Sequence, residues 1–127
     1  MRADRMGRVV AGISAAGFLG TAALHGTGYP SIARAASGVH GVLGAAIPAL
    51  WLMFSLDLFV LGLVVGTVAA RPGRSARLIL GLAALCPLGA AGLQIHFIGF
   101  VAPTAVLLAV GVTTAAASAI GLRAPGA

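Results

Sequence analysis

The residue best suited to chemistry is Asp57, a carboxylic acid in the middle of a long apolar run. The run extends from Ile47 to Ala70 and contains no other charged residue. The chain has one other carboxylate, Asp4, which lies among arginines near the N-terminus. An ionised carboxylate in hydrocarbon is so costly that membrane proteins which keep one use it or pair it. We therefore predict an intramembrane site centred on Asp57.

Other polar side chains gather toward one end of the apolar runs. His25 and His96 are candidate catalytic acid–base groups beside Asp57, because a histidine near the lipid headgroups can exchange protons with water. The candidate ligand-binding side chains are Trp51, Ser55, Gln94 and Tyr29. Helical periodicity turns Ser55 away from Asp57, so a partner for the acid must come from another helix, and Gln94 is the predicted one. A Ser-His-Asp triad is discounted for the same reason.

The sequence contains no motif for a known cofactor or metal. It has neither C-x-x-C-H nor H-E-x-x-H spacing, and no Walker loop or GxGxxG. We predict no metal site, although the similar depth of His25 and His96 leaves haem or metal ligation open. The cofactor is unknown. Cys86 is the single cysteine and cannot form a disulfide within the chain.

Composition places these residues in a membrane protein. Hydrophobic residues make up 60% of the chain and charged residues 8%, against roughly 25% charged residues in soluble domains. The mean hydropathy is +1.09. A chain of 127 residues has room for four spans of about 20 residues. We predict one all-α domain over residues 1–127, an up-down-up-down bundle of four transmembrane helices with spans near 9–24, 47–70, 78–97 and 101–122.

The arginines indicate the orientation of the bundle. All eight basic residues are arginines, and they fall before the first span, between the second and third, and after the fourth: Arg2, Arg5, Arg8, Arg71, Arg74, Arg77 and Arg123. Only Arg34 breaks the alternation. The positive-inside rule then predicts that both termini are cytoplasmic. This placement favours the lipid bilayer as partner and argues against nucleic acid. The Arg, Ala and Gly usage indicates a bacterial inner (plasma) membrane.

Several residues predict details of helix packing. Gly12, Ala16 and Gly20 form a small-xxx-small stripe, and Gly62-x-x-x-Gly66 forms another, so close helix contacts are expected, and both a homodimer and a monomer are compatible with the sequence. Pro48 is predicted in the first turn of the second span. Pro87 predicts a kink in the third. Residues 31–45 are predicted as a short interfacial helix. The Arg-rich start and short first span also fit a cleaved signal peptide, which is the alternative for that segment.

Three functional hypotheses follow. The first is a site in the outer half of the membrane that binds a lipophilic small molecule or acts on it by acid–base chemistry, which leaves open whether the protein is an enzyme. The second is a proton-coupled carrier of the size of the small multidrug transporters. That similarity is one of size and design, because their acid lies in the first helix and Asp57 in the second. The third is an accessory or assembly subunit of a larger membrane complex, with Asp57 paired across the interface.

Overall fold

The computed structural model describes residues 2–122, with side chains from Arg5 onward, and this range is built from helices and short connections. The helices are α1 (Arg2–Thr27), α2 (Tyr29–Ala36), α3 (Val42–Ala70), α4 (Ala76–Phe97) and α5 (Ala102–Ile120). All except α2 are long and apolar enough to cross a membrane. The predicted four-helix membrane bundle is therefore confirmed. Arg123 lies outside the described residues.

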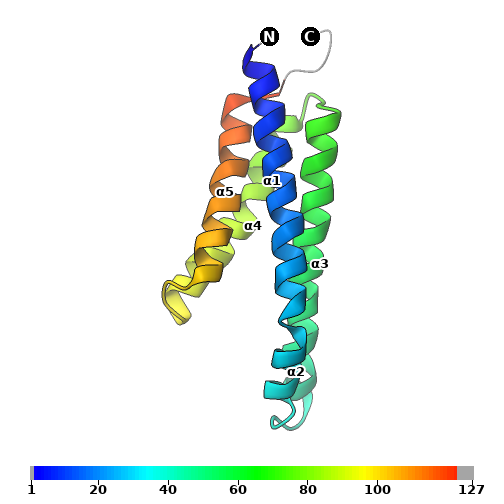
Figure 1. The fold of residues 1–127 in the computed structure, drawn as a ribbon, viewed down its shortest axis with the longest axis vertical. Coiled ribbons are helices and arrows are strands. Elements are labelled where there is room, and N and C mark those ends of the chain that lie inside the picture. Colours follow the sequence, from blue (N-terminus) through cyan, green and yellow to red (C-terminus); the bar gives the residue numbers. More distant parts are fainter. Residues whose placement is uncertain (1, 123–127) are drawn as a thin grey trace.

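The four long helices run alternately up and down (Figure 1). The start of α1, the α3–α4 connection and the end of α5 lie together at one end of the bundle. We call this the arginine-rich end, because Arg5, Arg8, Arg71 and Arg74 belong to these segments and Arg77 lies in the first turn of α4. The opposite end, which holds α2, is called the outer end, following the orientation that the arginines predict.

The bundle consists of two helix pairs that separate toward the outer end. Helix α1 packs along α3, and α4 packs along α5, while α3 and α4 barely touch. The pairs are joined mainly where α1 meets α5. Figure 1 shows α4 and α5 diverging from α1 and α3 on the way to the outer end. The buried residues of α3 are Leu58, Gly62, Val65 and Val68. The core along α3 therefore lies in the arginine-rich half, whereas α4 and α5 also bury residues nearer the outer end, among them Ala91 and Leu107.

Glycine allows the close contact between α1 and α3. A Cβ on Gly62 would lie 2.8 Å from the Leu19 side chain and 3.2 Å from the Cβ of Phe18, and one on Gly66 would lie 3.6 Å from Ala15. This glycine pair is thus used inside the chain. The other small-residue stripe is not, because Gly12, Ala16 and Gly20 are exposed on the outer surface of α1.

Buried hydroxyl groups join the two helix pairs in the same half. Ser14 of α1 and Thr114 of α5 share a hydrogen bond, and both side chains are buried. Because Thr114 donates its hydroxyl proton to the carbonyl of Val110, Ser14 is the donor to Thr114. Within the α4–α5 pair, the Ser118 hydroxyl at the arginine-rich end donates to the Arg77 carbonyl at 2.7 Å, and this bond is exposed.

Two boundary predictions for the outer end are wrong. Helix α3 begins at Val42, so Pro48 lies inside the helix and not in its first turn. Gly44 permits this longer helix, since a Cβ there would lie 2.0 Å from the Val39 carbonyl oxygen in the preceding turn. The predicted interfacial helix over residues 31–45 is shorter and earlier, because α2 ends at Ala36. With 29 residues, α3 is about 43 Å long and exceeds the thickness of a hydrocarbon core.

Candidate functional site

The opening between the helix pairs contains a cavity of about 420 Å³. Its walls come from all four long helices and from the α4–α5 connection. The lining residues are Thr21, Leu24, His25, Trp51, Phe54, Gln94, Ile98, Val101, Ala102, Pro103, Val106 and Leu107. Most of these side chains are apolar, and Leu24 and Ile98 at the rim are 69% and 70% exposed. The cavity is therefore a mostly apolar cleft that two exposed apolar side chains border.

A break between α1 and α2 builds one wall of the cavity. Helix α1 ends at Thr27, which leaves the carbonyl groups of its last turn without helical donors. The His25 carbonyl accepts the Gly28 N–H at 3.1 Å and the Trp51 indole N–H at 2.8 Å. A Cβ on Gly28 would lie 2.8 Å from the Trp51 ring. The glycine in this turn therefore provides the space that the indole occupies.

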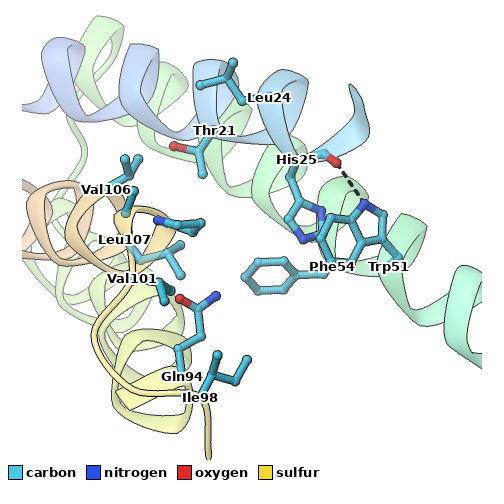
Figure 2. Close-up of a pocket in the computed structure, with 12 residues that line it drawn as sticks. Thr21, Leu24, His25, Trp51, Phe54, Gln94, Ile98, Val101, Val106 and Leu107 are labelled. Atoms are coloured by element: carbon cyan, nitrogen blue, oxygen red, sulfur yellow. Dashed lines mark hydrogen bonds between the residues drawn. The ribbon is translucent and has the colours of Figure 1, made fainter. Parts of the chain in front are cut away.

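The His25 ring is held by α3 through three contacts. It stacks on Trp51 with ring centroids 3.8 Å apart and planes 15° apart. Phe54 meets it edge-on at 5.0 Å. Its Nδ1 lies 2.8 Å from the Ser55 hydroxyl oxygen. Figure 2 shows the ring between Trp51 and Phe54 on the cavity wall. These contacts fix both the plane of the imidazole and its rotation.

Gln94 supplies the polar group on the facing wall. The fully buried Thr104 donates its hydroxyl proton to Gln94 Oε1 at 2.9 Å. The Thr104 oxygen in turn accepts the Val101 N–H at 3.4 Å. With its oxygen anchored in this way, the amide nitrogen of Gln94 is on the side that faces Phe54 and His25 (Figure 2). Gln94 thus faces the wall that holds His25 and Trp51, whose indole N–H is already bonded to the His25 carbonyl.

The structure brings together four of the residues that the sequence singled out. His25, Trp51 and Gln94 line the cavity. Ser55 does not line it but forms a hydrogen bond with the His25 ring. Trp51 and Ser55 are also linked, because the Ser55 hydroxyl donates to the Trp51 carbonyl at 3.2 Å. These contacts join α1 to α3 at the outer end, where the apolar core is absent.

Asp57 is not one of the residues that line the cavity. Its side chain is exposed on the surface of the bundle, within electrostatic range of the Cys86 thiol on α4. The predicted pairing with Gln94 is not present, since no hydrogen bond joins the two side chains; the one that Gln94 makes is with Thr104. Among the described residues, no hydrogen bond or ion pair reaches the Asp57 carboxylate. The acid is therefore exposed and has no partner in this part of the chain.

Two further predicted residues also lie outside the cavity lining. His96 is exposed and meets the neighbouring Phe97 edge-on at 4.6 Å. Tyr29 is half-buried at the start of α2. Conversely, the cavity includes Phe54 and Thr21, which the sequence interpretation did not single out as site residues. The i, i+3, i+4 spacing of Trp51, Phe54 and Ser55 is the signal for this shared helix face.

The arrangement suits binding of an apolar molecule with a small polar group. Apolar side chains supply most of the lining, and His25 and Gln94 supply hydrogen-bonding groups. Within residues 5–122, no group of three or more His, Cys, Asp and Glu side chains is placed to hold a metal ion. His25 is the titratable side chain of the lining, so acid–base chemistry in the cavity would fall to it.

Fold and cavity together define a small polytopic membrane protein with four membrane-spanning helices. Comparison with known proteins adds no family to this class: no family model, curated protein or solved structure matches the chain.

Proposed function

We propose that the protein binds a lipophilic small molecule in the cavity between its two helix pairs. The observation that carries this proposal is an apolar cleft of about 420 Å³, which falls in the range of about 300–1,000 Å³ typical of ligand sites. The proposed ligand contacts are the rings of Trp51 and Phe54 and the polar groups of His25 and Gln94. Ser55 acts by holding His25. The proposed location is the outer half of a bacterial inner membrane.

The proposal of ligand binding rests on the cleft and not on Asp57, because Asp57 does not line the cleft. A ligand can enter sideways from the outer leaflet past the exposed Leu24 and Ile98. Apolar molecules already concentrate in the bilayer, so a modest intrinsic affinity suffices for occupancy. If the protein is an enzyme, His25 is the proposed acid–base residue because it is the one that lines the cavity.

Trp51 provides a direct test, because it is the single tryptophan and lines the cavity. The protein is reconstituted in phosphatidylcholine vesicles and titrated with 1-bromo-4-nonylbenzene, whose bromine quenches tryptophan on contact. We expect saturable quenching. Ala102 lines the cavity, whereas Ala105 is exposed and lies outside the lining. The Ala102→Phe variant should therefore lose saturation and Ala105→Phe should keep it. Quenching that rises linearly in all three proteins would contradict the proposal.

The exposed Asp57 favours a second candidate function, that of a subunit in a larger membrane complex. Asp57 is about 20 Å of helix rise from Ala70, and therefore deep in the bilayer. A partner helix that carries a cation or hydrogen-bond donor at this depth would remove the cost of exposing the acid to lipid. Native mass spectrometry from mild detergent tests this role. The subunit role predicts that the wild type forms a defined assembly, either a homodimer or a heteromer. Asp57→Leu should dissociate this assembly, and Asp57→Asn should weaken it. A monomeric wild type would contradict it.

A proton-coupled carrier remains an alternative prediction. It differs from the other two functions in requiring vectorial transport. Proteoliposomes with an imposed pH gradient distinguish it, since substrate uptake should depend on the gradient and be lost in Asp57→Asn.

A further inference from the structure

The class of ligand can be inferred from the direction of the hydrogen bonds around His25. Trp51 donates its indole proton to the His25 carbonyl. Ser55 donates its hydroxyl proton to the Trp51 carbonyl at 3.2 Å. A serine hydroxyl has one proton, so the Ser55 oxygen faces His25 with a lone pair. With the Ser55 proton on the Trp51 carbonyl, Nδ1 carries a proton and is the donor across the 2.8 Å contact with Ser55.

This assignment determines the chemistry of the other ring nitrogen. In a neutral imidazole with a proton on Nδ1, Nε2 is an acceptor. No described residue forms a hydrogen bond with His25 Nε2. Every fully buried side-chain nitrogen or oxygen in the described part of the chain has a partner, so Nε2 must be accessible. Since His25 lines the cavity, its Nε2 lone pair is available to a ligand there.

Gln94 presents a hydrogen-bond donor to the cavity, whereas His25 presents an acceptor. Its oxygen is occupied by the Thr104 hydroxyl, which leaves the amide N–H groups as donors on the cavity side (Figure 2). The lining contains no lysine or arginine and no acid. The two walls thus present one hydrogen-bond acceptor and one hydrogen-bond donor to a ligand. They provide no charged side chain that would balance the charge of an ionic ligand.

We propose that the cavity selects uncharged lipophilic alcohols or phenols. The ligand hydroxyl donates its proton to His25 Nε2, and an oxygen of the same polar group accepts from the Gln94 amide. An ether or ester of the same shape lacks the donor and leaves Nε2 unsatisfied. A carboxylate presents a negative charge to the lone pair. This inference rests on the proposed function, because it specifies the ligand of the same cavity.

Competition with the bromine quencher tests the selectivity. The competitors are 4-nonylphenol, its methyl ether 4-nonylanisole, and 4-nonylbenzoate. We expect the phenol to restore Trp51 fluorescence at a concentration about tenfold lower than the ether, which corresponds to one net hydrogen bond. The benzoate should be the weakest competitor. Equal competition by phenol and ether, or strongest competition by benzoate, would overturn the inference and leave the lipophile site itself intact.

Variants separate the roles of the polar groups. His25→Phe keeps an aromatic ring between Trp51 and Phe54 but removes the acceptor, so phenol and ether should compete equally. Gln94→Met removes a donor that both ligands use, so both should weaken while the phenol preference remains. Ser55→Ala leaves the Nδ1 proton without its acceptor and should reduce the preference. A full phenol preference in His25→Phe would overturn the inference. If the wild type shows no saturable quenching, the proposed function itself fails.

Discussion

The imidazole of His25 and the indole of Trp51 are joined twice. The rings stack at 3.8 Å, and the indole N–H donates to the carbonyl of the same histidine at 2.8 Å. One contact fixes the side chain of His25, and the other satisfies its backbone at the end of α1. The pair therefore fastens α1 to α3 at the outer end, beyond the last buried residue of either helix, and also forms one wall of the cavity.

Replacement of Trp51 by phenylalanine should weaken this attachment. The substitution keeps an aromatic ring against His25 but leaves the His25 carbonyl without the indole donor. We expect the free energy of unfolding to fall by about 1 kcal/mol, the usual contribution of one hydrogen bond. Thermal unfolding in detergent, followed by far-ultraviolet circular dichroism, measures the change. Trp51→Ala should cost more, because it also removes the stacked ring. Unchanged stability in Trp51→Phe would contradict the structural role of the N–H.

Gly28 and Gly26 form a matched pair for testing the shape of the wall. A Cβ on Gly28 would lie 2.8 Å from the Trp51 ring, whereas one on Gly26 would meet nothing within 4 Å. Gly28→Ala should displace the indole, shift the Trp51 emission maximum and weaken ligand binding severalfold. Gly26→Ala should have none of these three effects. Fluorescence spectra of the two variants check the prediction, and identical shifts would show that the turn does not hold the indole as described.

The contact between α1 and α3 should depend on Gly62. Its substitution by alanine places a methyl group 2.8 Å from the Leu19 side chain, and overpacking of this kind costs about 1–3 kcal/mol. Gly20 provides the control, because a Cβ there meets nothing within 4 Å. Gly20→Ala should be neutral or stabilising, since alanine favours a helix over glycine by about 1 kcal/mol. Equal unfolding midpoints for the two variants would contradict the close α1–α3 contact.

The protonation of the His25 ring can be observed directly. Nitrogen-15 NMR of the histidine side chains at alkaline pH distinguishes the two neutral tautomers. We expect His25 to be protonated on Nδ1 and bare on Nε2, and Ser55→Ala to reduce this preference. His96 is exposed and has no hydrogen bond to a described residue, so its spectrum should show both neutral tautomers. A protonated Nε2 in His25 would reverse the inferred ligand polarity.

The apolar composition predicts the four spans well, because any segment that crosses a bilayer must be a continuous apolar helix. The boundaries are less predictable. Pro48 is compatible with the first turn of a helix, but α3 extends six residues before it because Gly44 lets the chain pass close to Val39. The contact spans only five residues, but neither the position of Pro48 nor the apolar pattern reveals it.

The candidate site was likewise predictable from the sequence only in part. His25, Trp51 and Gln94 are recognisable as polar or amphipathic groups near one end of the spans, and the cavity includes all three. The surroundings of Asp57 are not predictable from its residue type. Its depth follows from the sequence, but its direction depends on how α3 rotates against α1, and that rotation is set by the Gly62 and Gly66 contacts.

The central claim is that a lipophilic molecule occupies the cleft between the helix pairs. Photolabelling with a diazirine-bearing alkylphenol in vesicles, followed by peptide mass spectrometry, tests it most directly. We predict that labelling concentrates on the cavity lining, near Trp51, Phe54 and Val106, and falls when unlabelled 4-nonylphenol is added. The exposed leucines Leu82 and Leu85 on α4 lie outside the lining and report background from the bilayer. Labelling spread evenly over these leucines and the lining, with no competition, would contradict the claim.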